Sequence, residues 1–211
     1  MDADLLLRIY SVGAFPMWNE ESGEIHIFRP DPRAIIESGG LHVPRRLART
    51  MRSHPFRITT DRAFDRVLDE CHRGRVDGCW CSPGMAVAYS ELHDRGFAHS
   101  VEAWLGDRLV GGLYGVHLGS AFMAESMFSR PGEGGTDASK IALVKTATCL
   151  EIAGFELFDV QFENDHLLQF GVVEISDDDY VRRFERASRS IRDWPVAALD
   201  GTSQPRGDGS V

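Results

Sequence analysis

Residues 98–116 read AHSVEAWLGDRLVGGLYGV, and this pattern predicts a β-hairpin. Two apolar runs, residues 99–105 and 108–116, flank the dipeptide Gly106-Asp107, which is a signal for a tight turn between antiparallel strands. Residues 121–127, AFMAESM, continue the pattern as a third strand. The middle of the chain therefore predicts an antiparallel sheet.

The region after this sheet alternates between helical and strand patterns. The predicted elements are a helix over residues 138–153, a strand over 155–162, a short helix over 164–170, a strand over 172–175 and a helix from 176 to about 189. Thr136 or Asp137 can cap the first of these helices, and Ser176-x-x-Asp179 can open the last one. This order favours an α+β fold with a mixed sheet, as in the acetyltransferase-like (GNAT) architecture.

The region before the sheet is richer in turns. Its predicted elements are a helix over residues 4–12, a break at Gly13-Ala14-Phe15-Pro16, a polar loop over 19–23, a stiff segment Arg29-Pro30-Asp31-Pro32-Arg33, a helix over 44–53, a strand over 58–60, a helix that Asp61 can cap and a helix over 84–96. We therefore predict a small N-terminal domain over residues 1–57 and an acetyltransferase-like domain over 58–197. The Gly-, Ser-, Pro- and Asp-rich tail, residues 198–211, is predicted to be disordered.

Composition is that of a globular protein with its own core. Of 211 residues 43% are hydrophobic, and no apolar run approaches the roughly 18 residues of a membrane span. The N-terminus lacks a basic start followed by a long apolar stretch, so we expect no signal peptide and a cytoplasmic protein. Cys71, His72, Cys79 and Cys81 could be read as a zinc cluster, but C-x-C differs from the usual C-x2-C spacing. We predict reduced, buried thiols and no metal.

The formal net charge of −9 argues against indiscriminate coating of nucleic acid. One segment, residues 42–57, is nevertheless rich in arginine. Arg45, Arg49 and Arg52 are spaced i, i+4, i+7, so they share one face of a helix. That face is either an ordinary solvated surface or a patch that contacts phosphates.

Polar residues within apolar strand patterns are candidates for chemistry. Because side chains alternate along a strand, Asp159 and Gln161 lie on the same face of the strand predicted over residues 155–162. A buried carboxylate needs a partner, so Asp159 either holds a helix end or an arginine, or joins Gln161 in orienting a substrate amine. Glu125 is a second charge within an apolar strand, where it is either solvent-facing or part of a site.

An aromatic loop precedes the helix predicted over residues 84–96. Trp80 lies in Gly78-Cys79-Trp80-Cys81-Ser82-Pro83, and Tyr89 follows on the helix. A tryptophan in such a loop either fills the core or offers a flat surface on which a base at a single-stranded RNA end can stack.

Several blocks resemble the leucyl/phenylalanyl-tRNA–protein transferases, in the order of that family and over about residues 8–185. The blocks are GAFPM at 13–17, PDPR at 30–33, AHSVE at 98–102, LVGGLYGV at 109–116, ESMFSR at 125–130, ASK at 138–140 and Asp159-x-Gln161-x-x-Asn164-Asp165-His166. The resemblance implies transfer of Leu or Phe, with Met as a further candidate, from aminoacyl-tRNA to the N-terminal amine of proteins that begin with Arg or Lys, marking them for N-degron degradation. It implies a monomer without a cofactor and no contact with a membrane.

The same resemblance implies roles for individual residues. Asp159 and Gln161 match the catalytic pair, and Glu125 matches an acid of the same site that, with Asp159, would suit a basic acceptor. Trp80 matches the aromatic residue that receives the terminal adenosine, with Tyr89 nearby, and Asn164 falls in the catalytic block. The residues that match the donor side-chain pocket are Leu113, Phe122, Leu143 and Phe158.

Two other functions compete with this one. An acetyl-CoA-dependent N-acetyltransferase would hold pyrophosphate at a Gly-rich loop before a helix, but here Glu133 stands at the required glycine position of residues 130–136. A non-catalytic module that binds tRNA ends or N-degrons would keep Trp80 and need neither Asp159 nor Gln161.

Overall fold

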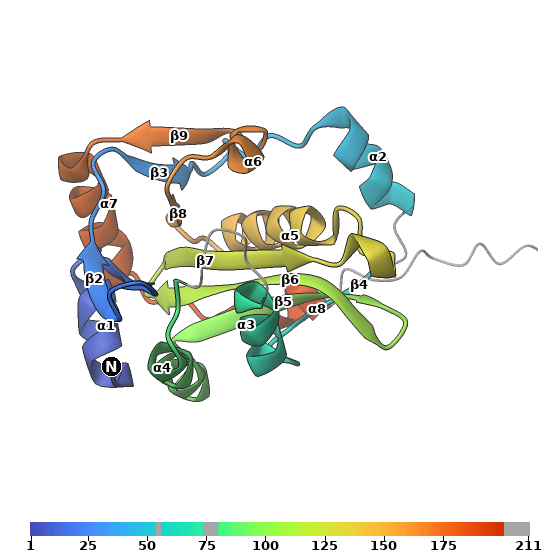
Figure 1. Ribbon diagram of the computed structural model, residues 1–211. Coiled ribbons are helices and arrows are strands. Elements are labelled where there is room, and N and C mark those ends of the chain that lie inside the picture. Colours follow the sequence, from blue (N-terminus) through green and yellow to red (C-terminus); the bar gives the residue numbers. More distant parts are fainter. Residues whose placement is uncertain (54–55, 74–79, 201–211) are drawn as a thin grey trace, which may run out of the picture.

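The computed structural model describes residues 1–53, 56–73 and 80–200, whose strands form a seven-stranded mixed sheet and a separate hairpin. The order in the larger sheet is β4-β5-β6-β7-β8-β3-β9 (Figure 1). The strands are β1 (Phe15–Asn19), β2 (Glu24–Phe28), β3 (Arg33–Ile36), β4 (Arg57–Thr60), β5 (Ala98–Leu105), β6 (Arg108–Leu118), β7 (Ala121–Ser129), β8 (Leu157–Gln161) and β9 (Val172–Ile175). The helices are α1 (Ala3–Ser11), α2 (Arg45–Ser53), α3 (Phe64–His72), α4 (Pro83–Asp94), the 3-10 helix η1 (Pro131–Glu133), α5 (Ala138–Ile152), α6 (Asp165–Leu168), α7 (Asp177–Arg189) and α8 (Val196–Asp200). The predicted α+β class with a mixed sheet is confirmed.

The antiparallel centre of the sheet follows the prediction. β5 and β6 form a hairpin around Gly106, and β7 pairs antiparallel with β6. β7 and β8 are parallel, so the chain needs a crossover between them, and α5 supplies it. The helices expected over residues 138–153 and 176–189 correspond to α5 and α7, and Ser176 caps α7 by accepting from the Asp179 N–H.

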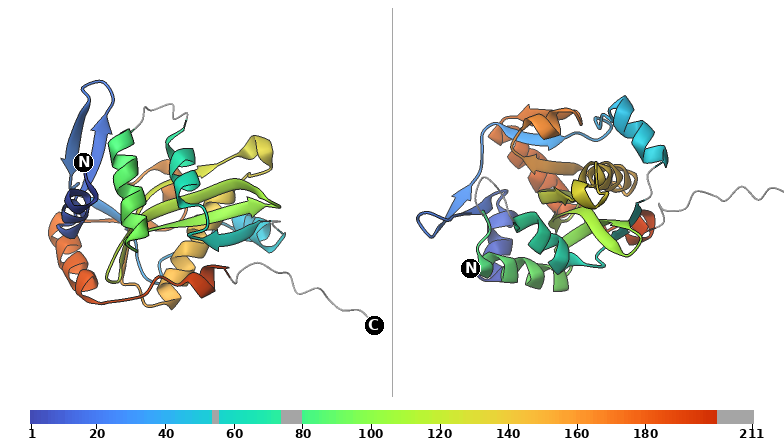
Figure 2. Two further views of the ribbon diagram at one scale, coloured as in Figure 1. Left: turned by 90° about the horizontal axis from the view of Figure 1, so that it is seen from below. Right: turned by 45° about the vertical axis from the view of Figure 1, so that its right-hand side comes forward.

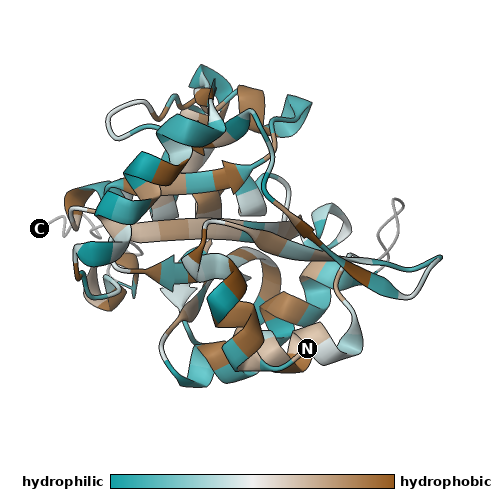
Figure 3. Cartoon of the chain, turned by 90° about the vertical axis from the view of Figure 1, so that its left-hand side faces the viewer, coloured by the Kyte–Doolittle hydropathy of each residue, from teal (hydrophilic) through white to brown (hydrophobic). Residues whose placement is uncertain are grey.

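Helices cover both faces of the sheet. α5 packs on β5, β6 and β7, whereas α3 and α4 lie on the opposite face, where α1 packs against α4 (Figures 1 and 2). Hydrophobic residues follow the strands between these layers (Figure 3). The core consequently has two parts, one around Tyr89 and Tyr114 and the other around Phe122 and Leu143.

Residues from the turn-rich N-terminal segment also enter the larger sheet. β3 lies between β8 and β9 and is antiparallel to both. The hairpin β1–β2 stands apart from that sheet (Figure 2). These three strands were absent from the sequence expectation. The division into domains at residue 57 stays a prediction.

Two expected helix caps are wrong. Asp137 is the N-cap residue of α5, but its side chain makes no capping hydrogen bond. Asp61 does not cap α3, whose N-cap residue is Ala63. The Asp61 carboxylate instead accepts hydrogen bonds across the sheet, from the Ser100 N–H at 2.9 Å and at 2.8 Å from His99 Nδ1. The strand beside it offered these donors, and Asp61 itself has a positive φ of 56°, which is unlike an N-cap conformation.

The C-terminal end of the described chain is anchored. α8 extends to Asp200, whose carboxylate accepts from the Thr60 N–H and from Arg62. Residues 201–211 of the predicted tail lie outside the described residues. Within the part of the chain that the structure describes, no helix has the length and apolar character of a membrane span.

Candidate active site

A cavity opens where two parallel strands stop pairing. β7 pairs with β8 only as far as Met123 and Asp159, although both strands continue. The cavity has a volume of about 730 Å³, within the roughly 300–1,000 Å³ typical of small-molecule sites. Residues that follow the last pair on each strand line it, together with the start of α5 and residues 164–167. It therefore lies at the carboxyl ends of β7 and β8.

Glu125 enters the cavity from an irregularity in β7. Tyr114 of β6 pairs with Ser126, and the next pair is Gly115 with Ala124, so Glu125 is the extra residue of a β-bulge. Bulges turn a side chain away from the regular alternation and are common beside active sites. Here the bulge directs a charged side chain within an apolar strand into the cavity wall.

Gln161 faces Glu125 from β8, also beside a bulge. Ala34 pairs with Gln161 and Ile35 with Asp159, which leaves Val160 as the extra residue. Gln161 has a φ of 67°, a conformation that residues other than glycine seldom adopt. Its Nε2 donates to Glu125 Oε1 at 2.7 Å, so two distant parts of the sequence meet in one polar pair.

Asp159 lies beneath this pair and is fully buried. Its Oδ1 accepts from Arg33 Nε at 2.9 Å and from the Gln161 N–H at 2.8 Å. Its Oδ2 accepts from Arg33 Nη2 at 2.6 Å and from the Tyr180 hydroxyl at 2.8 Å. Of the two roles open from the sequence, Asp159 thus holds an arginine, and it contacts Gln161 through the backbone.

The carboxyl group of Glu125 has an unusual environment. Burial raises its pKa from 4.5 to about 7, against the opposing effect of hydrogen bonds from Tyr10 and Gln161. Tyr89 donates to Glu125 Oε2 at 3.3 Å, and the Tyr89 and Tyr10 hydroxyls are 2.7 Å apart. Burial also raises the pKa of both tyrosines well above 10, so they stay neutral at physiological pH. Glu125 can therefore take up or release a proton near neutral pH.

Trp80 forms part of the aromatic wall of the cavity. It is half-buried, and its ring contacts His72 edge-to-face with centroids 5.0 Å apart. Tyr89 lies behind it with a centroid distance of 6.5 Å. Met17 and Phe15 line the same cavity from β1. The wall combines flat apolar surfaces with the polar Glu125–Gln161 pair.

The four residues expected in the donor pocket do not lie together on the cavity surface. Leu113 and Leu143 line the cavity. Phe122 and Phe158 are buried in the core behind it, with ring centroids 5.5 Å apart, and Phe122 also contacts Trp194. Asn164 lines the cavity, and its side chain caps α6 by accepting from the Leu167 N–H.

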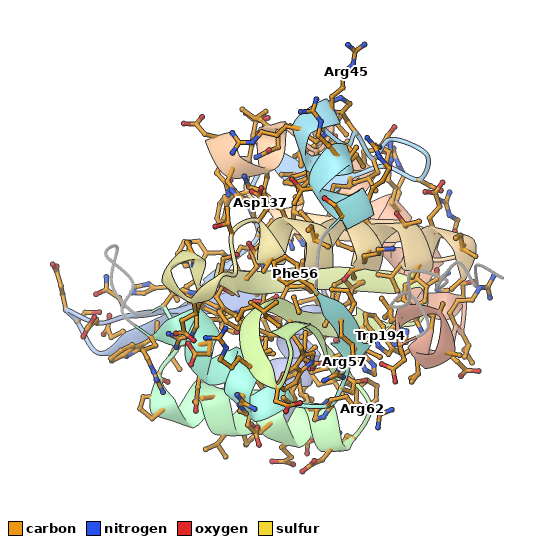
Figure 4. The ribbon with its side chains drawn as sticks, turned by 90° about the vertical axis from the view of Figure 1, so that its right-hand side faces the viewer. Arg45, Phe56, Arg57, Arg62, Asp137 and Trp194 are labelled. Atoms are coloured by element: carbon orange, nitrogen blue, oxygen red, sulfur yellow. The ribbon has the colours of Figure 1, made fainter. Side chains whose placement is uncertain are left out.

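The arginines of α2 form a surface separate from the cavity lining. Arg45, Arg49 and Arg52 are exposed, and none has an ion pair with a residue that the structure describes. Arg45 points away from the molecule in Figure 4. Leu47 is the buried residue of this helix, so the arginines take the opposite, solvated side. The helix face predicted from their spacing is confirmed, and its binding role stays a prediction.

The cysteines give no sign of a metal site in the described ranges. Cys71, Cys81 and Cys149 are buried, and Cys79 lies outside the described residues. No group of three or more His, Cys, Asp or Glu side chains suited to a metal occurs among residues 1–53, 56–73 and 80–200.

Sequence reasoning missed three residues around Asp159 and Glu125. Arg33 and Tyr10 come from β3 and α1, far from β8 along the chain, and Tyr180 comes from α7, the third element after β8. One signal could have pointed to Arg33, because it ends the quoted block Pro30-Asp31-Pro32-Arg33 and begins an apolar run. No local pattern pairs it with Asp159.

Comparison with known proteins places the chain in a family. Residues 35–185 match the family model described as leucyl/phenylalanyl-tRNA protein transferase. A leucyl/phenylalanyl-tRNA–protein transferase of Caulobacter vibrioides (strain NA1000 / CB15N) is 47% identical, over 94% of this chain and 91% of the relative. One of Phenylobacterium zucineum (strain HLK1) is 45% identical, over 99% and 93%. The resemblance seen in the sequence blocks is confirmed, and the chain belongs to the leucyl/phenylalanyl-tRNA–protein transferase family.

Proposed function

We propose that this protein transfers leucine or phenylalanine from aminoacyl-tRNA to the N-terminal amine of proteins that begin with Arg or Lys. The names of its relatives support leucyl- or phenylalanyl-tRNA as the donor and a protein as the acceptor. The observation that carries the proposal in this chain is the pair Gln161 Nε2 and Glu125 Oε1, 2.7 Å apart, on the wall of a cavity with an apolar side.

The reaction needs positioning more than a strong base. The amine nitrogen attacks the ester carbonyl, an N–C bond forms, and the C–O bond to the ribose breaks. The proton lost by the amine replaces the bond on the ribose oxygen. The donor ester is already activated, and an α-amino group has an ordinary pKa of about 7.7–8.0. Holding the two reactants together can lower the barrier by up to roughly 7–11 kcal/mol.

Gln161 and Glu125 have complementary tasks in this scheme. Because Gln161 Nε2 donates to Glu125, the Gln161 Oε1 atom is the group left to accept a hydrogen bond from the substrate amine. Glu125, with a pKa of about 7, can take the proton that the amine loses. An acid within about one pKa unit of the amine makes this transfer nearly balanced, at about 1 kcal/mol. Asp159 contributes by orienting Gln161.

The rest of the cavity suits the donor. Leu113 and Leu143 offer an apolar surface for Leu, Phe or Met side chains, and Trp80 can stack the terminal adenine at about 1–3 kcal/mol per base. The exposed arginines of α2 can meet phosphates of the acceptor stem. Glu125 and Asp165, both on the cavity wall, provide negative charge for a basic acceptor residue. We further propose the acetyltransferase-like architecture, a monomer and a cytoplasmic location.

Acetyl-CoA is a poorer candidate for the donor. Arg130, before the glycine-rich loop, forms ion pairs with Glu70 and with Glu133 at 3.2 Å, so its charge is already compensated. Glu133 itself would repel a pyrophosphate group. No observation in this chain favours acetyl transfer over aminoacyl transfer.

The test is direct transfer of label. The protein is incubated with radiolabelled Leu-tRNA and peptides that begin with Arg, Lys or Asp, and with an Arg peptide whose N-terminus is acetylated. We expect label in the Arg and Lys peptides and none in the acetylated peptide. Equal labelling of the Asp peptide would reject the acceptor class, and no labelling of any peptide would reject the function. Protection against heat by acetyl-CoA would favour the acetyltransferase alternative.

A further inference from the structure

Arg33 is a fully buried charged side chain beside Asp159. It is 1% exposed, lies between the rings of Phe15 and Tyr180 with its guanidinium carbon 4.7 and 4.4 Å from their centroids, and donates to both oxygens of Asp159. It also donates to the Gly13 carbonyl at 3.3 Å. Such a bidentate pair has a defined geometry because the guanidinium is planar. Arg33 has no direct role in the bond-making, bond-breaking or proton-transfer steps of the proposed reaction.

Tyr180 completes the surroundings of the Asp159 carboxylate. Its hydroxyl donates to Asp159 Oδ2 at 2.8 Å and accepts from Arg33 Nη2 at 3.3 Å. Burial raises the pKa of Tyr180 well above 10, so the hydroxyl keeps its proton and stays a donor. Arg33 and Tyr180 therefore fix the orientation of the Asp159 carboxylate, whose Oδ1 also accepts from the Gln161 N–H.

The Asp159 carboxylate contacts Gln161 through the Gln161 backbone. The Gln161 N–H donates to Asp159 Oδ1 at 2.8 Å, and Gln161 has a φ of 67°. A residue other than glycine keeps such a conformation only where its surroundings hold it there. Without that conformation the Gln161 side chain would leave β8 in another direction and its Nε2 would lose Glu125.

We propose that Arg33 and Tyr180 are positioning residues for the transfer reaction, which act through Asp159 to hold Gln161 against Glu125. Neither residue lines the cavity, so neither touches substrate. The inference rests on the proposed aminoacyl transfer. It assigns a task in that reaction to the Pro-Asp-Pro-Arg segment and to α7.

A merely structural role is the competing explanation. Arg33 also ties the α1–β1 connection to the sheet through Gly13, so its loss could simply destabilise the fold. Tyr180→Phe is the better variant because it removes one hydroxyl and keeps the ring that packs on Arg33. Tyr114→Phe is the matched control: its hydroxyl is also buried, makes a hydrogen bond of 3.1 Å with His72 Nε2 and does not reach Asp159.

The experiment is a double-mutant cycle of Tyr180→Phe and Gln161→Ala, in which Leu-tRNA and the Arg peptide are each varied at saturating concentrations of the other to give kcat and both KM values. In the wild-type background Tyr180→Phe should lower kcat about tenfold, because a hydrogen bond to a charged group is lost, and leave both KM values nearly unchanged. In the Gln161→Ala background the same change should have no further effect, since there is no Gln161 side chain to position. Tyr114→Phe should leave kcat nearly unchanged.

Two kinetic results would overturn the proposal: an equal loss of kcat in both backgrounds, or no loss in the wild-type background. A readout that needs no enzymatic activity separates failure of the positioning proposal from failure of the proposed function. The side-chain amide NMR signal of Gln161, assigned by its absence in Gln161→Ala, should shift in Tyr180→Phe and in Arg33→Lys but not in Tyr114→Phe. An unchanged signal in Tyr180→Phe would reject the positioning role even if the wild-type protein transfers no amino acid at all.

Discussion

Replacing Glu125 by glutamine should remove a specific pH dependence of stability. In the folded protein the pKa of Glu125 is about 7, against 4.5 for an ordinary glutamate. A raised folded-state pKa means that the folded chain binds the proton more tightly, so stability is fully present below about pH 4.5 and is lost as the pH rises through 7. The difference of 2.5 units corresponds to roughly 3 kcal/mol. Glutamine keeps the shape of the side chain and does not ionise.

The measurement is the free energy of unfolding in urea, for the wild type and Glu125→Gln, from pH 5 to pH 8.5. The free energy of unfolding of the wild type should decline relative to that of the variant as the pH rises. In thermal unfolding at pH 8, the melting temperature of the variant should be several degrees higher, since about 1 kcal/mol corresponds to about 2–4 °C in a chain of this size. Parallel curves for the two proteins across this range would refute the reasoning about burial.

Glu102→Gln is a control that separates stability from chemistry. Glu102 is also buried, and burial raises its pKa, but it accepts hydrogen bonds from Thr59 and Ser100 and does not line the cavity. Both glutamine variants should lose part of the decline in stability with rising pH. The pH profile of kcat should change only for Glu125→Gln, with loss of the rise whose midpoint lies near pH 7.

Three further outcomes are expected. Leu143→Ala should shift donor preference from Leu toward Phe by about tenfold in kcat/KM, since one methylene in a pocket contributes about 1–3 kcal/mol, whereas Leu150→Ala, buried on the same helix away from the cavity, should leave the ratio unchanged. Neutralising Arg45, Arg49 and Arg52 together should reduce the slope of log affinity for tRNA against log salt by about 2–3, and an unchanged slope would rule out this surface as the phosphate contact. Burial lowers the pKa of His117, so the folded chain binds that proton less tightly and stability falls as the pH drops below about 6.5; His117→Gln should show a smaller drop in melting temperature between pH 7.5 and pH 5.

The local elements were predictable because their determinants are close in sequence. The hairpin around Gly106 needs only two apolar runs and a turn, and α7 needs only Ser176 ahead of an amphipathic run. β9 was expected with the boundaries that the structure has. The family resemblance likewise depends on contiguous blocks, so it could be read before any contact was known.

β3 and the contacts of Asp61 could not be predicted from neighbouring residues in the sequence, because their partners are nonlocal. β3 is four residues long and buried throughout, so it has no alternation to read, and its partners lie more than a hundred residues later. Asp61 stands where a helix cap would be expected, yet a neighbouring strand supplied better donors. In both cases the competing partner came from elsewhere in the fold.

The sequence by itself determined the class of fold and the family, and it singled out Glu125, Asp159 and Gln161, since residue type and spacing carry that information. Only the tertiary structure decided how those residues are used. It paired Asp159 with Arg33, turned Glu125 and Gln161 toward each other at two bulges, and left Phe122 and Phe158 behind the cavity. The physical reason is that a buried charge takes its partner, and a strand its direction, from the surfaces that folding brings against it, whatever their distance along the chain.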